Sequence, residues 1–248
     1  MGKIKLSDIS TRAPKDLDKE ATKEKTLKIL GDLDELQNLL YAESKHSVLV
    51  VIQGMDASGK DGAVRNVFGK LNPLGVMVKP FKAPTAEELA HDFLWRIHSH
   101  TPAKGMIQVF NRSHYEDILI TRVHKWIDDK TAKKRMRAIN DFEWLLTEHN
   151  NTHILKFYLH ISPEEQQERL NERIKMPQKQ WKYNENDFAE AKLWNDYMEM
   201  YGDCFENCNE VPWTIVPADQ NWYKEHIIAK ELKNLLTSLD MKYPGLKK

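Results

Sequence analysis

The chain has 248 residues, of which 41% are hydrophobic and 30% charged, with 10 Gly, 10 Pro and 2 Cys. This composition excludes a disordered chain, and the length suits one domain that carries an inserted lid. Lys and Arg number 37, as do Asp and Glu, so the net charge is zero and we expect no nucleic-acid partner. A mean hydropathy of −0.64 without a long apolar run predicts no membrane partner. Because no secretory signal is present, we expect a cytoplasmic protein.

The first predicted element is an amphipathic helix over residues 19–45, where leucines recur at helical spacing opposite a polar face. We expect residues 1–45 to form an N-terminal helical extension and residues 46–248 to form the core domain. Cys204 and Cys208 lie four apart on a predicted helix, where a disulfide is geometrically awkward, so we expect free thiols.

Five short apolar runs predict strands that are buried on both faces of a parallel sheet. They lie at 46–53, 75–81, 105–110, 153–161 and 213–216. Amphipathic stretches predict helices near 60–71, 85–100, 115–128, 131–149, 163–175, 187–208 and 221–240. The helix at 163–175 has a strong start, with Ser162 as N-cap, Pro163 at the first position and Glu165 completing a capping box. Strict alternation of strands and helices predicts a three-layer α/β/α fold around a five-stranded parallel sheet.

A phosphate-binding pattern follows the first predicted strand. Residues 54–60 satisfy G-x-x-x-x-G-K between a buried strand and a helix. In such a loop the glycines let backbone amides surround phosphate oxygens, the helix presents its positive end, and Lys60 adds a point charge. The alternative is a glycine-rich turn with a surface lysine, but sequence and context both favour the phosphate loop. The candidate phosphate contacts are Gly54, Ala57, Ser58, Gly59, Lys60, Asp61 and Gly62.

The loop lacks the hydroxyl that normally holds Mg²⁺, because Asp61 stands where Ser or Thr usually follows the lysine. A carboxylate must then supply the metal ligand, and Asp56 inside the loop is the nearest candidate. The alternative is that Asp56 only caps the turn, as aspartate commonly does. Asp61 lies in the first helical turn, where an acid is favoured with or without metal.

Polar residues are concentrated after the third predicted strand, over residues 110–117. In an open parallel sheet, ligands bind at this carboxyl edge. Arg112 can fork onto phosphate oxygens, and Asp117 or Glu116 can complete an oxygen shell for Mg²⁺. The alternative is a capped helix start with an acidic first turn, which would explain Glu116 alone.

With these segments identified, the sequence resembles the type-2 polyphosphate kinases, within the P-loop kinases similar to thymidylate kinase. The resemblance covers about residues 46–223. It rests on the loop with Asp in its third position and Gly after Lys-x, on the block at 110–117, and on a stretch from Arg169 to Trp181 where such kinases carry a lid. The block is similar to that of the subgroup acting on both nucleoside mono- and diphosphates. Other subgroups have Asp where Asn111 stands, so Asn111 is not counted as a metal ligand and Asp117 takes that place.

The resemblance implies a P-loop kinase with a helical lid at about residues 169–186. It implies reversible transfer of a terminal phosphoryl group from inorganic polyphosphate to AMP or ADP, with Mg²⁺ as cofactor and with ATP among the nucleotides bound. We also expect a homo-oligomer.

A local excess of basic residues favours a polyanionic donor. The segment from Arg169 to Lys182 contains several basic residues and a single acid, Glu172, in a chain of zero net charge. Arg169 and Arg173 are four apart and share a helix face, so both guanidinium groups point the same way. A chain of phosphates would be held by such a strip largely through counterion release. The alternative is an ordinary solvated helix end and loop. The basic residues are Arg169, Arg173, Lys175, Lys179 and Lys182; Lys79 and Lys82, after the second strand, either extend the strip or decorate a loop.

Phosphoryl transfer needs alignment and charge neutralisation rather than a covalent enzyme intermediate. We therefore assign Lys60, Asp117, Arg112 and Asp56 to catalysis, with Asp56 and Asp117 as Mg²⁺ ligands. Arg112, Arg169 and Arg173 contact phosphate oxygens, together with Lys79 and Lys82. His114 is expected to have a structural role, while Trp181 and Tyr183 either stack on a base or pack the lid.

Two other functions compete with this one. The first is an ATP-dependent nucleoside or nucleotide kinase, although such relatives usually keep Ser or Thr after the loop lysine. The second is a P-loop module that binds a nucleotide without turnover, which would need switch loops rather than a basic lid.

Overall fold

The protein is described by a computed structural model that covers residues 4–246. Its centre is a single all-parallel sheet with the strand order β2-β3-β1-β4-β5. The strands are β1 (Ser47–Gly54), β2 (Val76–Pro80), β3 (Ile107–Asn111), β4 (Thr152–His160) and β5 (Trp213–Pro217). Each strand lies within two residues of its predicted bounds, so the sheet predicted from the apolar runs is confirmed.

The middle of the sheet is its most buried part. Every residue of β1 is buried, because β3 and β4 flank it and helices cover both faces. In the parallel register Val50 pairs with Val109 of β3 and with Leu155 of β4. The phosphate loop therefore begins at the end of the most constrained strand of the sheet.

Long helices form the outer two layers of the fold. The longer helices are α1 (Lys19–Glu43), α2 (Lys60–Val67), α6 (Asp129–Asn150), α7 (Pro163–Lys175), α10 (Trp194–Asn207) and α11 (Asn221–Ser238). The shorter ones are α3 (Ala86–Leu89), α4 (Trp95–His98), α5 (Ile120–Val123), α8 (Pro177–Gln180) and α9 (Glu185–Ala191). Single turns of 3₁₀ helix occur at Leu6–Asp8, Phe68–Lys70 and His114–Ile118.

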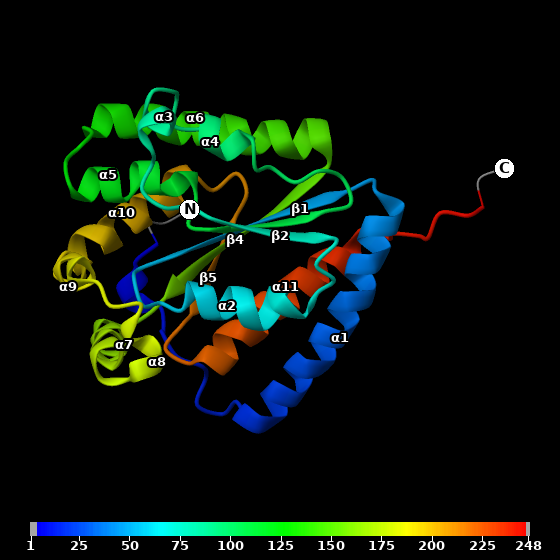
Figure 1. The fold of residues 1–248 in the computed structure, drawn as a ribbon, viewed down its shortest axis with the longest axis horizontal. Coiled ribbons are helices and arrows are strands. Elements are labelled where there is room, and N and C mark those ends of the chain that lie inside the picture. The colour runs from blue at the N-terminus through cyan, green and yellow to red at the C-terminus, as the bar shows by residue number, and fades with distance from the viewer. Residues whose placement is uncertain (1–3, 247–248) are drawn as a thin grey trace.

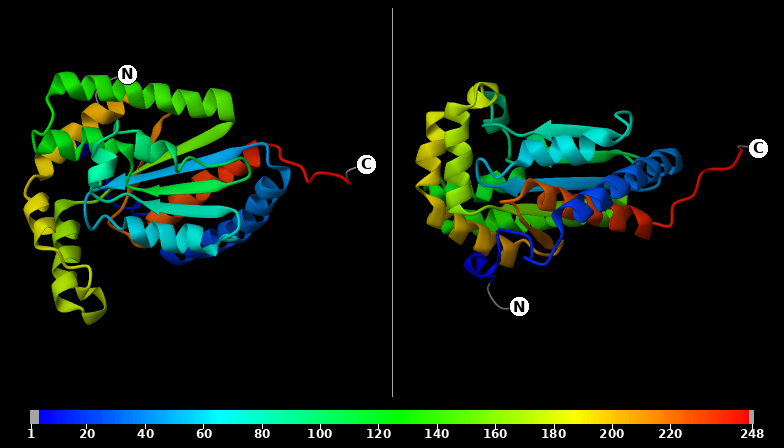
Figure 2. Two further views of the ribbon diagram at one scale, coloured as in Figure 1. Left: turned by 45° about the horizontal axis from the view of Figure 1, so that its top comes forward. Right: turned by 90° about the horizontal axis from the view of Figure 1, so that it is seen from below.

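The helices separate to the two faces of the sheet as the alternation predicts. Helices α1, α2 and α11 lie on one face, and α4, α5 and α6 lie on the other (Figure 1). Helices α7, α8 and α9 gather beyond the end of the sheet, near the tips of the strand arrows (Figure 2). These three helices occupy the position expected for a lid.

Three predicted helices, over residues 85–100, 115–128 and 187–208, are wrong because each segment is broken in two. The second becomes a 3₁₀ turn followed by α5, and the third becomes α9 and α10, while the first divides into α3 and α4. Thr85 caps α3 through a reciprocal capping box with Glu88, and α3 ends after one turn. The carboxylate of Asp92 then accepts the backbone N–H of Leu94 at 2.9 Å, which holds a turn before α4. Local side-chain bonds to the backbone therefore replace the continuous helix that the apolar spacing favours.

The helix before β1 packs directly on the last helix of the chain. Leu33 and Leu40 of α1 are fully buried, and Thr26 Oγ1 lies 2.9 Å from Nδ1 of His226 in α11. Lys233 of α11 donates to Asp32 of α1 at 2.6 Å. Residues 19–43 thus pack into the same hydrophobic core as the sheet.

Helix α7 has the bounds predicted from its sequence. Ser162 caps it by accepting the N–H of Glu165 at 3.2 Å, and Pro163 occupies the first turn. The predicted capping box is not formed, because the Glu165 carboxylate accepts instead from Nε of Arg169 at 2.8 Å.

Cys204 and Cys208 are free and buried, as expected. Among the helices described, none combines the length and apolar content needed to cross a bilayer.

Candidate active site

The phosphate loop joins β1 to α2 in a conformation that suits its glycines. Gly59 has a φ of +92°, and Ala57 also lies in the left-handed region at +63°. A Cβ atom on Gly54 would lie 2.9 Å from the carbonyl oxygen of Leu159 in the neighbouring strand β4. Close approach at Gly54 and the backbone turn at Gly59 both favour glycine, so the two glycines of the motif have separate structural reasons.

Lys60 folds back over its own loop. Its ammonium donates to the carbonyl oxygens of Gly54 at 2.7 Å and Met55 at 3.1 Å, and the residue is 8% exposed. Burial, followed by the charge of Arg112, lowers the pKa of Lys60 to about 8 and outweighs the opposing carboxylates. A phosphate group placed before the loop would restore the charged form of this lysine.

A cavity of about 1160 Å³ opens in front of the loop. Its walls are the loop with α2, the segments that follow β2 and β3, and the lid helices α7 and α8. It is lined by ten of the predicted site residues, namely Asp56, Ala57, Gly59, Lys60, Asp61, Gly62, Lys82, Arg112, Arg169 and Arg173. The structure therefore brings the loop, the end of β3 and the lid to one site.

Four predicted site residues do not line this cavity: Gly54, Ser58, Lys79 and Asp117. Ser58, within the loop, is fully buried. The Lys79 ammonium lies 5.8 Å from the centroid of the Phe81 ring, so its described contact is with an aromatic face rather than with the loop. Lys79 lies within β2 rather than in a loop after it, and its assignment to phosphate stays a prediction.

Arg112 connects the end of β3 to the phosphate loop. Its φ is +62°, an uncommon conformation for a residue with a side chain. The guanidinium forms an ion pair with Asp56 and lies 3.9 Å from the carboxylate of Glu116. Arg112 therefore combines an uncommon backbone conformation with a side chain that lines the cavity.

Asp56 is the carboxylate of this site that fits a bound cation. Burial alone would raise its pKa, but Lys60 and Arg112 outweigh burial and hold the pKa below its ordinary value. An ionised carboxylate that lines the cavity is a suitable Mg²⁺ ligand, since Mg²⁺ needs only one or two carboxylates besides substrate phosphates and water. Over residues 4–246 no cluster of three or more His, Cys, Asp or Glu side chains could hold a metal unaided.

Asp117 does not line the cavity that Asp56 lines. Its carboxylate lies 3.6 Å from the guanidinium of Arg135 in α6. Burial raises the pKa of Asp117 to about 6, and Arg135 only partly offsets it. Glu116, which the sequence left as the alternative, is the member of this acidic pair that faces Arg112. The geometry therefore favours Glu116 over Asp117 as a neighbour of the loop.

Replacing Asp117 by asparagine is expected to stabilise the fold. A carboxyl with a folded pKa of about 6 binds protons more tightly than in the unfolded chain, so it reduces stability as pH rises from 4 to 6. At pH 7.5 the penalty is up to about 3 kcal/mol, which Asp117→Asn removes. Thermal unfolding should show a higher midpoint for the variant at pH 7.5 and little change at pH 4. A lower midpoint at pH 7.5 would contradict this account.

The basic strip of the lid is largely paired with acids from outside the segment. Arg173 forms an ion pair with Asp187, and Lys182 donates to Asp61 of α2 at 2.7 Å. Lys179 pairs with Glu172 inside the strip. A charge count over residues 169–182 therefore overstates the free positive charge, because it leaves out Asp187 and Asp61. The Lys182 contact also links the lid to the helix that follows the loop.

Asp61 has a structural environment rather than that of an open ligand. Oδ1 accepts from the Asn111 amide at 2.9 Å, and Oδ2 accepts from Lys182 at 2.7 Å. Burial raises its pKa, but these two hydrogen bonds outweigh burial and leave the pKa below its ordinary value. Asn111, which sequence reasoning set aside as a ligand, thus holds a carboxylate beside the loop.

His114 and the lid aromatics have clear positions. His114 is fully buried, with Nε2 at 3.5 Å from a Glu143 carboxylate oxygen, so it lies in the core as its expected structural role requires. Trp181 lines the cavity and is 79% exposed, whereas the ring of Tyr183 lies 6.2 Å from that of Phe188. Of the two aromatic residues, Trp181 lines the cavity and Tyr183 does not, so Trp181 is the better placed to meet a base.

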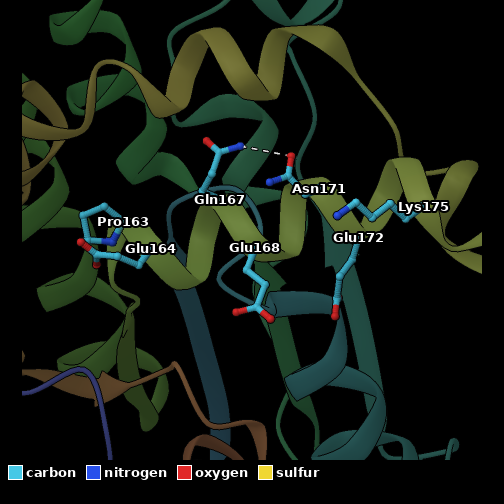
Figure 3. A pocket seen from close by; sticks show the side chains of 7 residues that line it. All are labelled: Pro163, Glu164, Gln167, Glu168, Asn171, Glu172 and Lys175. Carbon is cyan, nitrogen blue, oxygen red and sulfur yellow. Dashed lines mark hydrogen bonds between the residues drawn. The ribbon is translucent and has the colours of Figure 1, made fainter.

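A second hollow, of about 630 Å³, lies on the outer side of α7 (Figure 3). Its lining residues are Pro163, Glu164, Gln167, Glu168, Asn171, Glu172 and Lys175. Acids outnumber bases here, so this surface is unsuited to a phosphate chain. The phosphate chemistry belongs to the inner side of α7.

Comparisons with known proteins identify the family. Residues 16–244 match Polyphosphate kinase 2 (PPK2). The chain is 46% identical over 214 residues to the AMP/ADP-polyphosphate phosphotransferase of Meiothermus ruber, covering 86% of this chain and 80% of that relative. It is 42% identical over 226 residues to the ADP-polyphosphate phosphotransferase of Rhodopseudomonas palustris, covering 86% and 78%. The crystal structure of Polyphosphate Kinase 2 from Arthrobacter aurescens TC1 matches with a TM-score of 0.95 and 41% identity, covering 99% of this chain and 89% of that one.

The matched region contains the phosphate loop, the segment after β3 and the lid. The resemblance that the sequence motifs indicate is confirmed over nearly the whole chain, and so is the P-loop α/β fold that it implies. The protein belongs to the polyphosphate kinase 2 family and is a phosphotransferase.

Proposed function

We propose that the protein transfers a terminal phosphoryl group reversibly between inorganic polyphosphate and AMP or ADP, with ATP formed from ADP. The observation that carries the proposal is a single cavity with a phosphate loop on one wall and lid cations on the other. The named activities of its relatives, on polyphosphate with AMP or ADP, support the same substrates.

Each wall of the cavity has a role in transfer. We assign Lys60 and the loop amides to the moving phosphoryl group, where charge spreads over oxygens in a loose transition state. Arg112 at the end of β3 and Arg173 in the lid neutralise phosphate oxygens of either substrate. Asp187 holds Arg173 in place until a phosphate group competes for it.

Mg²⁺ is the proposed cofactor, and Asp56 is its first proposed ligand. When bound, the ion neutralises charge on donor and acceptor oxygens. Asp117 remains a predicted second ligand, with Glu116 as the alternative that faces the loop. The protein supplies an ionised carboxylate beside the loop and leaves the other coordination positions of the ion to phosphate oxygens and water.

The test is an assay without ATP. The protein is incubated with polyphosphate, Mg²⁺ and AMP, and the nucleotides are separated by chromatography over time. Formation of ADP and then ATP is expected. Product only when ATP replaces polyphosphate would identify an ATP-dependent kinase, and binding without turnover would identify a nucleotide-binding module.

Further properties are proposed on the same basis. We propose a homo-oligomer located in the cytoplasm, with no nucleic-acid or membrane partner. Residues 1–45 are the proposed extension and 46–248 the kinase core, with the lid at 169–186. Light scattering of the purified protein tests the oligomeric state.

Neutralising Arg173 is expected to weaken binding of long polyphosphate. Arg173→Ala removes a charged hydrogen-bond donor, so we expect KM for long polyphosphate to rise about tenfold. The affinity should also fall less steeply with added KCl, because one fewer counterion is released. Lys192→Ala, an exposed lysine between α9 and α10, is the matched control. Equal losses for short and long donors would argue against a polyphosphate channel.

A further inference from the structure

The carbonyl oxygens of the phosphate loop are bonded by side chains of the protein itself. Amides can surround a phosphate only if these carbonyls are bonded elsewhere. Lys60 takes the first two, from Gly54 and Met55, at 2.7 and 3.1 Å. The remaining loop carbonyls, from Asp56 to Gly59, accept hydrogen bonds from side chains of two distant helices, α7 and α11.

Arg169 of α7 uses every guanidinium donor within the protein. Nη1 donates to the carbonyls of Ala57 at 3.1 Å and Ser58 at 3.2 Å. Nη2 donates to the carbonyls of Ala218 and Asp219, each at 2.8 Å, after β5. Nε donates to Glu165 at 2.8 Å. Because a guanidinium has five N–H donors, none remains for a phosphate oxygen.

Lys224 of α11 is also fully used. It is fully buried, and its ammonium donates to Asn221 Oδ1 at 2.8 Å and to the carbonyls of Gly59 at 3.2 Å and Ser58 at 3.5 Å. A Cβ on Gly59 would lie 2.3 Å from this ammonium, so the glycine also makes room for Lys224. Among the described residues, no carboxylate lies within ion-pair distance of Lys224. Burial, followed by the charge of Arg169, lowers the pKa of Lys224 to about 7. A buried amine whose hydrogen bonds all go to neutral oxygens suggests a positioning role.

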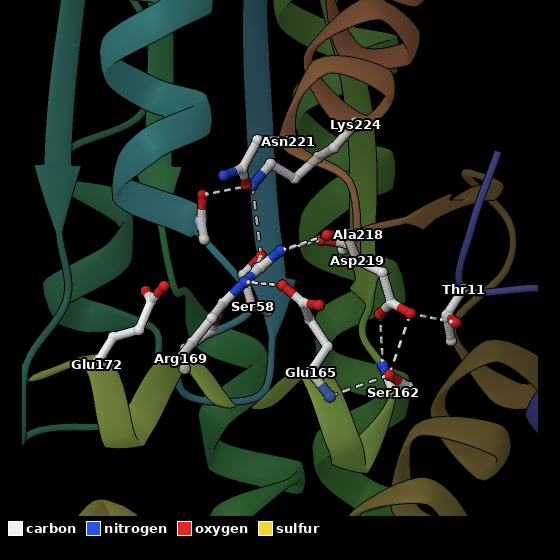
Figure 4. A network of polar contacts seen from close by, with 12 residues as sticks. Thr11, Ser58, Ser162, Glu165, Arg169, Glu172, Ala218, Asp219, Asn221 and Lys224 are labelled. Atoms are coloured by element: carbon white, nitrogen blue, oxygen red, sulfur yellow. Dashed lines mark hydrogen bonds and ion pairs between the residues drawn. The ribbon is translucent and has the colours of Figure 1, made fainter. Parts of the chain in front are cut away.

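Two further contacts complete the support behind the loop. Gln166 of α7 donates to the carbonyl of Asp56 at 3.0 Å. Asp219 accepts the backbone N–H of Ser162, the N-cap of α7, at 2.8 Å and the hydroxyl of Thr11 at 2.8 Å. The start of α7 is thereby anchored to the segment after β5 and to the N-terminal segment (Figure 4).

We propose that Lys224 and Arg169, assisted by Gln166, form a carbonyl clamp that positions the phosphate loop with its amides toward the cavity. In this role Arg169 acts through the loop instead of contacting phosphate, and α11 is part of the phosphate-binding apparatus. The clamp also fixes α7 against the loop, so Arg173, one turn further along the helix, has a set distance from Lys60.

The test separates positioning from direct phosphate contact by salt dependence. Binding of ADP and of long polyphosphate is measured at several KCl concentrations for Lys224→Met and Arg169→Lys. Lys230→Met, an exposed lysine on the same helix, is the control. Loss of a charged hydrogen bond corresponds to about tenfold weaker binding for both ligands. Because the clamp contacts no phosphate, the slope of log affinity against log salt should stay at the wild-type value in Lys224→Met.

Arg169→Lys gives an independent readout because it keeps the charge and loses the fork. A positioning role predicts weakened binding that lysine does not rescue, whereas a direct electrostatic contact predicts near-normal affinity and slope. A reduced slope in Lys224→Met, or affinities equal to wild type in both variants, would overturn the clamp. If Lys224→Met fails to fold, Gln166→Leu with Arg169→Lys decides the question. The clamp does not depend on the proposed donor: a wild-type protein that binds ADP but not polyphosphate would refute the proposed function, while the ADP data still test the clamp.

Discussion

Replacing Lys60 by alanine is expected to lower kcat by about 100-fold or more, with the fold retained. The lysine opens α2 at the end of the loop, lines the cavity and folds its ammonium back onto the loop, so it is the cation best placed to follow the moving phosphoryl group. Its low pKa, about 8, comes from burial, and a bound phosphate reverses that effect. The charged form of Lys60 is therefore more stable when a phosphate group is bound in the cavity than when the cavity is empty. Initial rates at saturating polyphosphate and AMP measure the loss.

The control for this experiment must separate chemistry from folding. Removing the ammonium leaves the Gly54 carbonyl without its partner, which lowers stability by about 1–3 kcal/mol. Rates are therefore compared at a temperature well below the unfolding midpoint of the variant. Lys60→Met keeps most of the side-chain length and should lose activity to the same extent, whereas Lys70→Ala, at an exposed position after α2, should not. Activity near wild type in Lys60→Met would remove Lys60 from catalysis.

The sequence predicts well those parts of the site that are contiguous in the chain. The loop after β1 is recognisable because a buried strand, a glycine pattern and a helix follow one another within a few residues. The segment after β3 is recognisable because parallel strands end at the same edge, which places Arg112 beside the loop. Both predictions depend on local order and on the topology of parallel sheets.

Contacts between distant segments could not be predicted in this way. The carbonyl partners of the loop come from Gln166, Arg169 and Lys224, more than 100 residues away in the chain. Helical spacing places Lys224 on the same face of α11 as Ile228, Leu232 and Leu236, whereas Lys230 lies on the exposed face. A lysine on the apolar face of a helix is thus visible in the sequence, but its partners in the phosphate loop are not.

The charge of the lid illustrates the same limit. A window from residue 169 to 182 contains one acid, yet Asp61 and Asp187 each neutralise a basic residue from outside it. Likewise, the choice between Glu116 and Asp117 depends on a short 3₁₀ turn that sends adjacent side chains to opposite sides. Sequence periodicity does not resolve the direction of side chains in a single turn.

Replacing Asp56 by asparagine is expected to raise the Mg²⁺ requirement and to reduce turnover. Asp61→Asn should change the Mg²⁺ requirement little. Asp56 is ionised, lines the cavity and lies inside the loop. Asp61 is already bonded through both oxygens, to Asn111 and to Lys182. Activity is titrated with MgCl₂ at fixed polyphosphate and AMP for both variants and the wild type.

For Asp56→Asn we expect at least about a tenfold higher Mg²⁺ concentration at half-maximal activity, since one charged ligand contact is lost. Removing the carboxylate also frees Arg112, which pairs with Asp56, so an effect of the arginine must be separated from an effect of the metal. Arg112→Lys keeps a positive charge beside Asp56 and should lower kcat without shifting the Mg²⁺ midpoint. If only Asp61→Asn raised the Mg²⁺ concentration at half-maximal activity, the metal ligand would be Asp61, in the first turn of α2, and not Asp56.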